Sequence, residues 1–239
     1  VAIGNTIFLL GYVWVGSSQA TSQPATEGTI VVMRTDDPVT STGQWYVHGL
    51  LSSICGASSA ILWKDSQGRS APVFVTGDGV YAIRLAPDNN VLDFISPSIE
   101  QLIPLAPDVN NGRALGVYNG DLIVSAGLSG KILRVVWRGA GQFSVEDVTP
   151  HWWSLAPNTT ASSFGTAALG WGEDFLLGYS TNDGSTASRV LALRDTGAGN
   201  FWHYVAQQGG TGKQISALLP DRVNDTVSFY YDEAAAVTT

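Results

Sequence analysis

Short apolar runs alternate with turn residues along the whole chain, a pattern typical of β-strands joined in a meander. One such stretch, a weaker copy of the repeat described next, lies between residues 59 and 96. An apolar run at the start of this segment, ended by a Gln67-Gly68 turn, is followed by three further runs. We expect these three as strands at Val73–Thr76, Val80–Leu85 and Val91–Ile95.

The pattern repeats at a fixed spacing. The sequence RALGVYNGDLIVS at residues 113–125 returns about 54 residues later as AALGWGEDFLLGY at residues 167–179. The residues that follow also match, with the same Gly-Ala-Gly-polar-Phe turn at Gly139–Phe143 and Gly197–Phe201. A period of roughly 50 residues is typical of stacked repeat architectures, so we expect each copy to form one structural unit.

Weaker copies flank this pair. Residues 214–233 match the first two strands of a unit, and three apolar runs near the start of the chain match the last three strands: Ile7–Val15, Thr29–Thr35 and Trp45–Leu50. The predicted units therefore span residues 56–108, 109–160 and 161–212, with partial units at about 1–55 and 213–239.

One four-stranded sheet has two apolar faces and cannot bury both alone, whereas stacking against neighbouring sheets covers them. We therefore predict an all-β fold: a β-propeller of four-stranded antiparallel blades, in a single region over residues 1–239. The first strand of each blade would line a crowded channel, which suits the small residues at 114–116 and 167–170. Trp45 and Trp202 are expected to pin one blade on the next. The chain is either a whole propeller or an incomplete part of a larger one.

Residues 80–94 and 190–204 are similar to the strand-turn-strand unit of pyrroloquinoline-quinone-type propeller repeats. Thr196-Gly197 and Trp202 match the Thr-Gly turn and the recurring Trp of that unit. The resemblance implies propeller geometry. It does not imply quinone binding, because no second motif of that family occurs, and we predict no cofactor.

Charge and composition exclude several classes of partner. Among 239 residues, 13% are charged and the net charge is -8, with no basic run, which disfavours nucleic-acid binding. The most apolar stretch, Ile7–Val15, is about half the length of a transmembrane helix and is predicted as a strand, so no membrane insertion is expected. The lone Cys55 permits neither an internal disulfide nor a cysteine-rich zinc site.

No catalytic or metal-binding motif occurs in the sequence. His48, His151 and His203 are spread over three units without metal-ligand spacing. Residues 180–187 resemble the Asp-box hairpin of sialidases, but Asn182 and Ala187 replace the Asp and the aromatic residue of that motif. We therefore predict neither catalytic residues nor a metal site.

The strongest candidate for binding is His151-Trp152-Trp153, in the linker that joins two predicted units. Adjacent Trp rings in a loop can stack on sugar rings or anchor a partner protein. In the alternative interpretation, one ring closes a blade interface and the other covers the apolar floor of the loop.

The scarcity of Lys, the Gly-, Ala- and Thr-rich strands and the lack of disulfides resemble propeller regions of bacteriophage tail proteins. That resemblance implies a non-catalytic structural protein of a virion, or an extracellular one, that docks other protein subunits or a host-surface glycan. Two alternatives stay open: a secreted carbohydrate-active enzyme or lectin of propeller fold, and a generic protein-interaction propeller.

Overall fold

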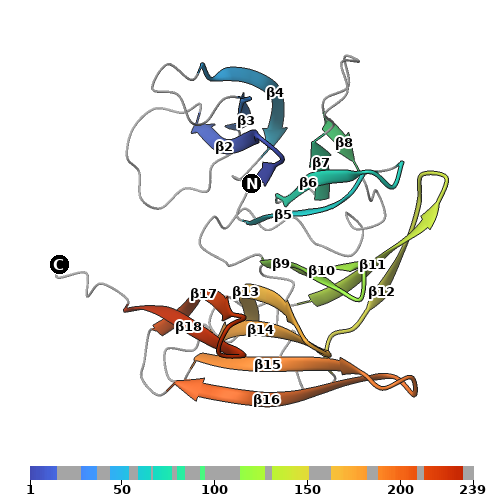
Figure 1. The fold of residues 1–239 in the computed structure, drawn as a ribbon, viewed down its shortest axis with the longest axis vertical. Coiled ribbons are helices and arrows are strands. Elements are labelled where there is room, and N and C mark those ends of the chain that lie inside the picture. Colours follow the sequence, from blue (N-terminus) through green and yellow to red (C-terminus); the bar gives the residue numbers. More distant parts are fainter. Residues whose placement is uncertain are drawn as a thin grey trace. The chain divides into compact units, whose positions relative to one another are not determined.

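The computed structural model describes residues 1–14, 28–36, 44–53, 59–65, 67–76, 80–83, 92–94, 114–126, 131–150, 163–181, 188–208 and 213–233. Every regular element in these ranges is a β-strand, and no helix long and apolar enough to cross a membrane occurs in them (Figure 1). The predicted all-β class is therefore confirmed.

The strands form four four-stranded antiparallel sheets and one two-stranded hairpin. Within each sheet the strands lie in chain order, as a meander requires. Sheet A holds β1 (Ala2–Ile3), β2 (Thr6–Trp14), β3 (Gly28–Thr35) and β4 (Tyr46–Ser53). Sheet B holds β5 (Ser59–Lys64), β6 (Ser70–Val75), β7 (Val80–Ile83) and β8 (Leu92–Phe94). Sheet C holds β9 (Ala114–Tyr118), β10 (Asp121–Ala126), β11 (Lys131–Gly139) and β12 (Gln142–Asp147). Sheet D holds β13 (Ser163–Trp171), β14 (Asp174–Thr181), β15 (Ser188–Asp195) and β16 (Asn200–Gln208). Hairpin E holds β17 (Lys213–Asp221) and β18 (Thr226–Glu233).

The chain divides into two compact units. The first comprises residues 1–110 and 135–145, and the second comprises residues 111–134 and 146–239. Sheets A and B thus belong to the first unit, whereas β9, β10, sheet D and hairpin E belong to the second. The arrangement of the sheets as blades of one propeller stays a prediction.

In the first unit, sheets A and B pack face to face. Alternate residues of β3 are buried, as expected of a strand with one face against a core. Ile30 and Val32 from β3, with Phe8 from β2, pack against Phe74 and Ile83 of sheet B. The turn predicted at Gln67-Gly68 is present, and Gly68 has a φ of +77°, a conformation that favours glycine.

In the second unit, sheet D is covered on both faces. Phe175, Leu177, Leu191 and Leu193 pack against a cluster from the second unit's part of sheet C and the segment after it, which includes Ala114, Tyr118 and Ile123. Leu176, Val190 and Ala192, on the other face, pack with Ile215 and Leu218 of hairpin E. The physical argument for stacking thus holds for sheet D, because its two apolar faces are buried by neighbouring strands on each side.

The first strands β9, β13 and β17 lie side by side in the second unit, and β9 and β13 are crowded where they meet. A Cβ atom at Gly170 of β13 would overlap the carbonyl oxygen of Val117 in β9. A Cβ atom at Gly116 would likewise overlap the ring of Phe175. Two of the small residues predicted for the first strands, Gly116 and Gly170, are therefore required by close approach between neighbouring sheets.

Two details differ from the expectation. The first repeat has an additional strand, β1, which pairs with β2 through Ala2↔Ile7 and Ile3↔Thr6. Its two residues are too few to show an alternating pattern in the sequence. Trp45, predicted to pin a blade, is 45% exposed instead of buried.

Candidate functional site

The predicted binding residues His151, Trp152 and Trp153 lie outside the described residues, as do Cys55, Asn182 and Ala187. The described chain ends at Pro150 on this side of the loop, and Pro150 is buried. The segment that leads into the predicted site, residues 147–150, is therefore described, and it forms one side of a groove.

The groove lies between residues 147–150, which end and follow β12, and residues 200–202, which begin β16. It has a volume of about 450 Å³. Both sides belong to the second unit.

Hydrogen bonds fix the segment 147–150 to the sheets beneath it. The indole Nε1 of Trp202 donates to the carbonyl oxygen of Val148 at 2.7 Å, and the N–H of Val148 donates to the carbonyl oxygen of Ile132 at 2.9 Å. The Trp202 ring also packs against the buried cluster between sheets C and D. The prediction that Trp202 joins neighbouring repeats is thereby confirmed, and the groove has a firm floor.

The polar side of the groove is Asp147. Its carboxylate accepts hydrogen bonds from Lys131 Nζ at 3.0 Å and from the N–H of Thr149 at 3.1 Å, and from the Thr149 hydroxyl. Partial burial opposes ionisation of Asp147, but the bonds from Thr149 and Lys131 outweigh it and lower the pKa of the carboxyl group. Asp147 is thus an oriented carboxylate at neutral pH.

The aromatic side of the groove is Phe201, which is 60% exposed. Phe201 and His203 are two residues apart in β16, so they share a face of the sheet. Their rings are nearly parallel, with centroids 5.9 Å apart and an interplanar angle of 21°. Asn200, exposed at the start of the strand, brings an amide group to the same place.

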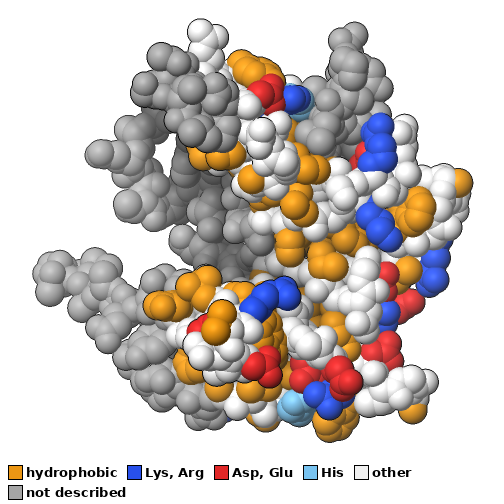
Figure 2. Space-filling view, in the orientation of Figure 1, with side chains coloured by type: hydrophobic (Ala, Val, Ile, Leu, Met, Phe, Trp, Pro, Cys, Tyr) orange, Lys and Arg blue, Asp and Glu red, His pale blue; other side chains and the backbone are white. Residues whose placement is uncertain are grey.

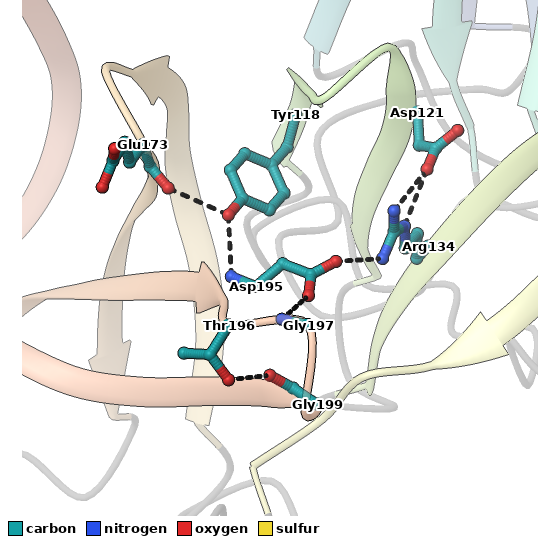
Figure 3. A network of polar contacts seen from close by, with 8 residues as sticks. All are labelled: Tyr118, Asp121, Arg134, Glu173, Asp195, Thr196, Gly197 and Gly199. Atoms are coloured by element: carbon teal, nitrogen blue, oxygen red, sulfur yellow. Dashed lines mark hydrogen bonds and ion pairs between the residues drawn. The ribbon is translucent and has the colours of Figure 1, made fainter.

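A second polar cluster joins sheets C and D at their turns (Figure 3). The buried hydroxyl of Tyr118 donates to the carbonyl oxygen of Glu173 at 2.9 Å and accepts from the N–H of Asp195 at 2.8 Å. Arg134 pairs with Asp121 at 2.7 Å and reaches Asp195 at 3.5 Å. The Tyr118 hydroxyl both donates and accepts within the cluster, and the Arg134 guanidinium pairs with the carboxylates of Asp121 and Asp195. We therefore assign the cluster a structural role.

The Arg of this cluster has counterparts in the third strands of two other sheets. Arg34 of β3 pairs with Asp36 at 2.8 Å, and Arg194 of β15 pairs with Asp174 at 2.7 Å. Each of these three third-strand Arg residues thus forms an ion pair within its own unit. Asp121 and Asp174 begin the second strands of their sheets and pair with an Arg of the third strand, whereas Asp36 follows its partner Arg34 by two residues.

The two described histidines belong to different units. His48 lies edge-on to Phe8 in the first unit, and His203 stacks on Phe201 in the second. Within the described ranges, no group of three His, Cys, Asp or Glu side chains is placed to hold a metal ion. The Asp-box-like residues follow the second strand of sheet D, since β14 ends at Thr181 and β15 begins at Ser188.

One face of sheet A is apolar and exposed. Four side chains on it are between 53% and 62% exposed: Leu9, Val13, Val47 and Leu50. The register places Leu9, Met33 and Val47 in one row across the sheet, and Gly11, Val31 and Leu50 in the next. On the face shown in Figure 2, acidic and basic side chains of the described residues are interspersed, and hydrophobic side chains reach the surface in several places.

Comparison of the chain with protein-family models and with curated proteins finds no match.

Proposed function

We propose that this protein is a non-catalytic β-repeat scaffold of propeller type that docks other protein subunits through the exposed face of sheet A. The observation that carries the proposal is that exposed apolar side chains lie in neighbouring rows across that face. Its opposite face, with Phe8, Ile30 and Val32, already packs against a neighbouring sheet in the same unit.

The propeller geometry is supported by the second unit. The four-stranded meander of sheet D there stacks through one face on the second unit's part of sheet C and through the other on hairpin E, and the first strands β9, β13 and β17 lie in series. Adjacent first strands with outer strands that spread apart are what radial stacking requires. The ring of blades itself is part of the proposal.

The exposed face of sheet A fits another sheet. Contiguous exposed apolar area on a soluble domain marks an interaction surface more often than scattered single residues do. Burying a half-exposed Val or Leu contributes roughly 1 kcal/mol, so four of them supply a useful part of an interface. The occupant that matches is an antiparallel sheet with alternating apolar residues, supplied by a partner subunit, because sheets A and B pack in this way.

The resemblance to bacteriophage tail proteins makes those subunits components of a virion in this proposal. The test is incorporation of the chain into particles. Leu50→Glu places a charge on the docking face and should lower incorporation by roughly tenfold. Val223→Glu, at a turn position that is 93% exposed, is the matched control and should leave incorporation unchanged.

Both variants should melt within about 2 °C of the parent chain, since both side chains are exposed. A preparation in which the parent chain is monomeric and never associated with particles would contradict the virion proposal. Equal incorporation of the two variants would contradict the assignment of the docking face.

A further inference from the structure

We propose that the groove between residues 147–150 and 200–202 binds the pyranose ring of a neutral sugar. The proposal rests on the described residues of the second unit and is independent of the docking face on sheet A. Three side chains supply its chemistry: an exposed ring at Phe201, an amide at Asn200 and a carboxylate at Asp147.

The ring of Phe201 is a prepared platform. It stands 60% exposed at the groove, and the parallel ring of His203 lies beside it at 5.9 Å. An exposed aromatic ring held in this way offers a flat apolar surface at little cost in side-chain entropy. The C–H groups on one face of a pyranose form the complementary surface.

The polar side matches sugar hydroxyl groups. An ionised carboxylate is an acceptor with about four lone-pair sites. In Asp147, Oδ1 accepts from the N–H and the hydroxyl of Thr149, and Oδ2 accepts from Lys131 Nζ. These bonds leave a lone pair of Oδ2 for a sugar O–H, and the amide of Asn200 brings both a donor and an acceptor for a neighbouring hydroxyl.

The charge at the groove favours an uncharged ligand. Asp147 and Lys131 form an ion pair at 3.0 Å, so neither charge selects an ion of opposite sign. The volume of about 450 Å³ lies within the range of small-ligand sites. The Trp202–Val148 hydrogen bond holds the two sides at a fixed spacing, so the groove exists before the ligand arrives.

The experiment uses the methyl glycosides of glucose, galactose, mannose and N-acetylglucosamine as probes. Binding to the full chain is measured by saturation-transfer NMR and by calorimetric titration. We expect at least one glycoside to bind with a Kd of about 1 mM. Phe201→Ala should weaken that binding by roughly tenfold, and Phe201→Trp should retain it.

Tyr230→Ala is the matched control, because Tyr230 is also an exposed aromatic residue, 56% exposed, on a strand of the same unit. It should leave the Kd unchanged, as should Leu50→Glu in the first unit. Thermal melting checks that Phe201→Ala is folded, which its exposure predicts.

Three results would overturn the proposal: no transfer to any of the four glycosides, an unchanged Kd in Phe201→Ala, or binding of the charged sugar N-acetylneuraminate alone. Particle incorporation of Phe201→Ala separates the two proposals, since loss of sugar binding with normal incorporation would leave the docking face intact.

Discussion

The hydroxyl group of Tyr118 joins parts of the chain that are far apart in sequence. It bonds to Glu173, 55 residues later, and to Asp195, 77 residues later. Its ring packs near Phe175 at the core between sheets C and D, with centroids 6.1 Å apart. At the scale of single residues, this side chain therefore adds two directed bonds to a contact that is otherwise apolar.

Tyr118→Phe tests this contribution. The change keeps the ring but removes the partner of one N–H and one carbonyl group in a part-buried place, so we expect a loss of about 1–3 kcal/mol in the free energy of unfolding. Denaturant titration measures it. Tyr46→Phe is the control, because the Tyr46 hydroxyl bonds to Asp36 at an exposed site and its loss should cost under about 0.5 kcal/mol. Equal losses in the two variants would remove the special role of Tyr118.

At the scale of strands, turns and short strands were predictable because their signals are local. Gln67-Gly68 and the Gly139–Phe143 turn show themselves by residue type alone, and β7 begins at the predicted Val80. The partners of Tyr118, Arg134 and Arg194 were not predictable, since they depend on which strands become neighbours. The candidate site was found only in part: the linker that holds His151 was singled out, but Asn200 and Phe201 meet residues 147–150 through folding alone.

The repeat spacing predicted from the sequence differs from the spacing in the structure by one residue. Aligning the Ala-Leu-Gly sequences gives a spacing of about 54 residues, but Tyr118↔Asp121 and Trp171↔Asp174 close equivalent hairpins 53 residues apart. The register of β13 with β14 shifts between Gly165 and Ala167. This shift precedes residues 168–170, so the difference of one residue has another origin: Gly116 lies two residues before the hairpin end at Tyr118, and Gly170 only one residue before Trp171.

Gly170→Ala tests the close approach of β13 to β9. The added methyl group meets the carbonyl oxygen of Val117, which is backbone and cannot rotate away, so we expect a loss of about 1–3 kcal/mol by denaturant titration. Gly11→Ala in β2 is the control, because the nearest atom to its Cβ is 3.9 Å away. A Gly170→Ala variant as stable as the control would show that the strands are farther apart than described.

At the scale of the whole molecule, the hydrogen bonds and ion pairs of several carboxyl groups favour the ionised form of those groups. The bond from Arg194 lowers the pKa of Asp174, and bonds from Thr6 and Arg34 lower the pKa of Asp36. The side chain and N–H of Asn224 lower the pKa of Asp221 in the same direction. Each of these groups binds its proton less readily in the folded than in the unfolded chain.

The stability of the protein should therefore fall in acid. The pKa values of these Asp residues in the folded chain lie below the ordinary value of about 3.9. Their contribution to the free energy of unfolding is therefore fully present above about pH 3.9 and is lost as the pH falls through their pKa values in the folded chain. We expect the Tm to be nearly constant from about pH 7 to 5 and to drop below about pH 4. Calorimetric scans across this range measure it, and Asp174→Asn should reduce the slope of the acid limb. A Tm that rises on acidification would contradict the lowered pKa values of these carboxyl groups.

The cluster at Tyr118 also constrains the length of one turn in the second unit. Glu173 lies in the turn between β13 and β14, whereas Asp195 is the last residue of β15, so one residue inserted before Glu173 in that turn would carry its carbonyl group out of bonding range. A change in the length of this turn would therefore remove one of the two bonds by which Tyr118 joins the sheets.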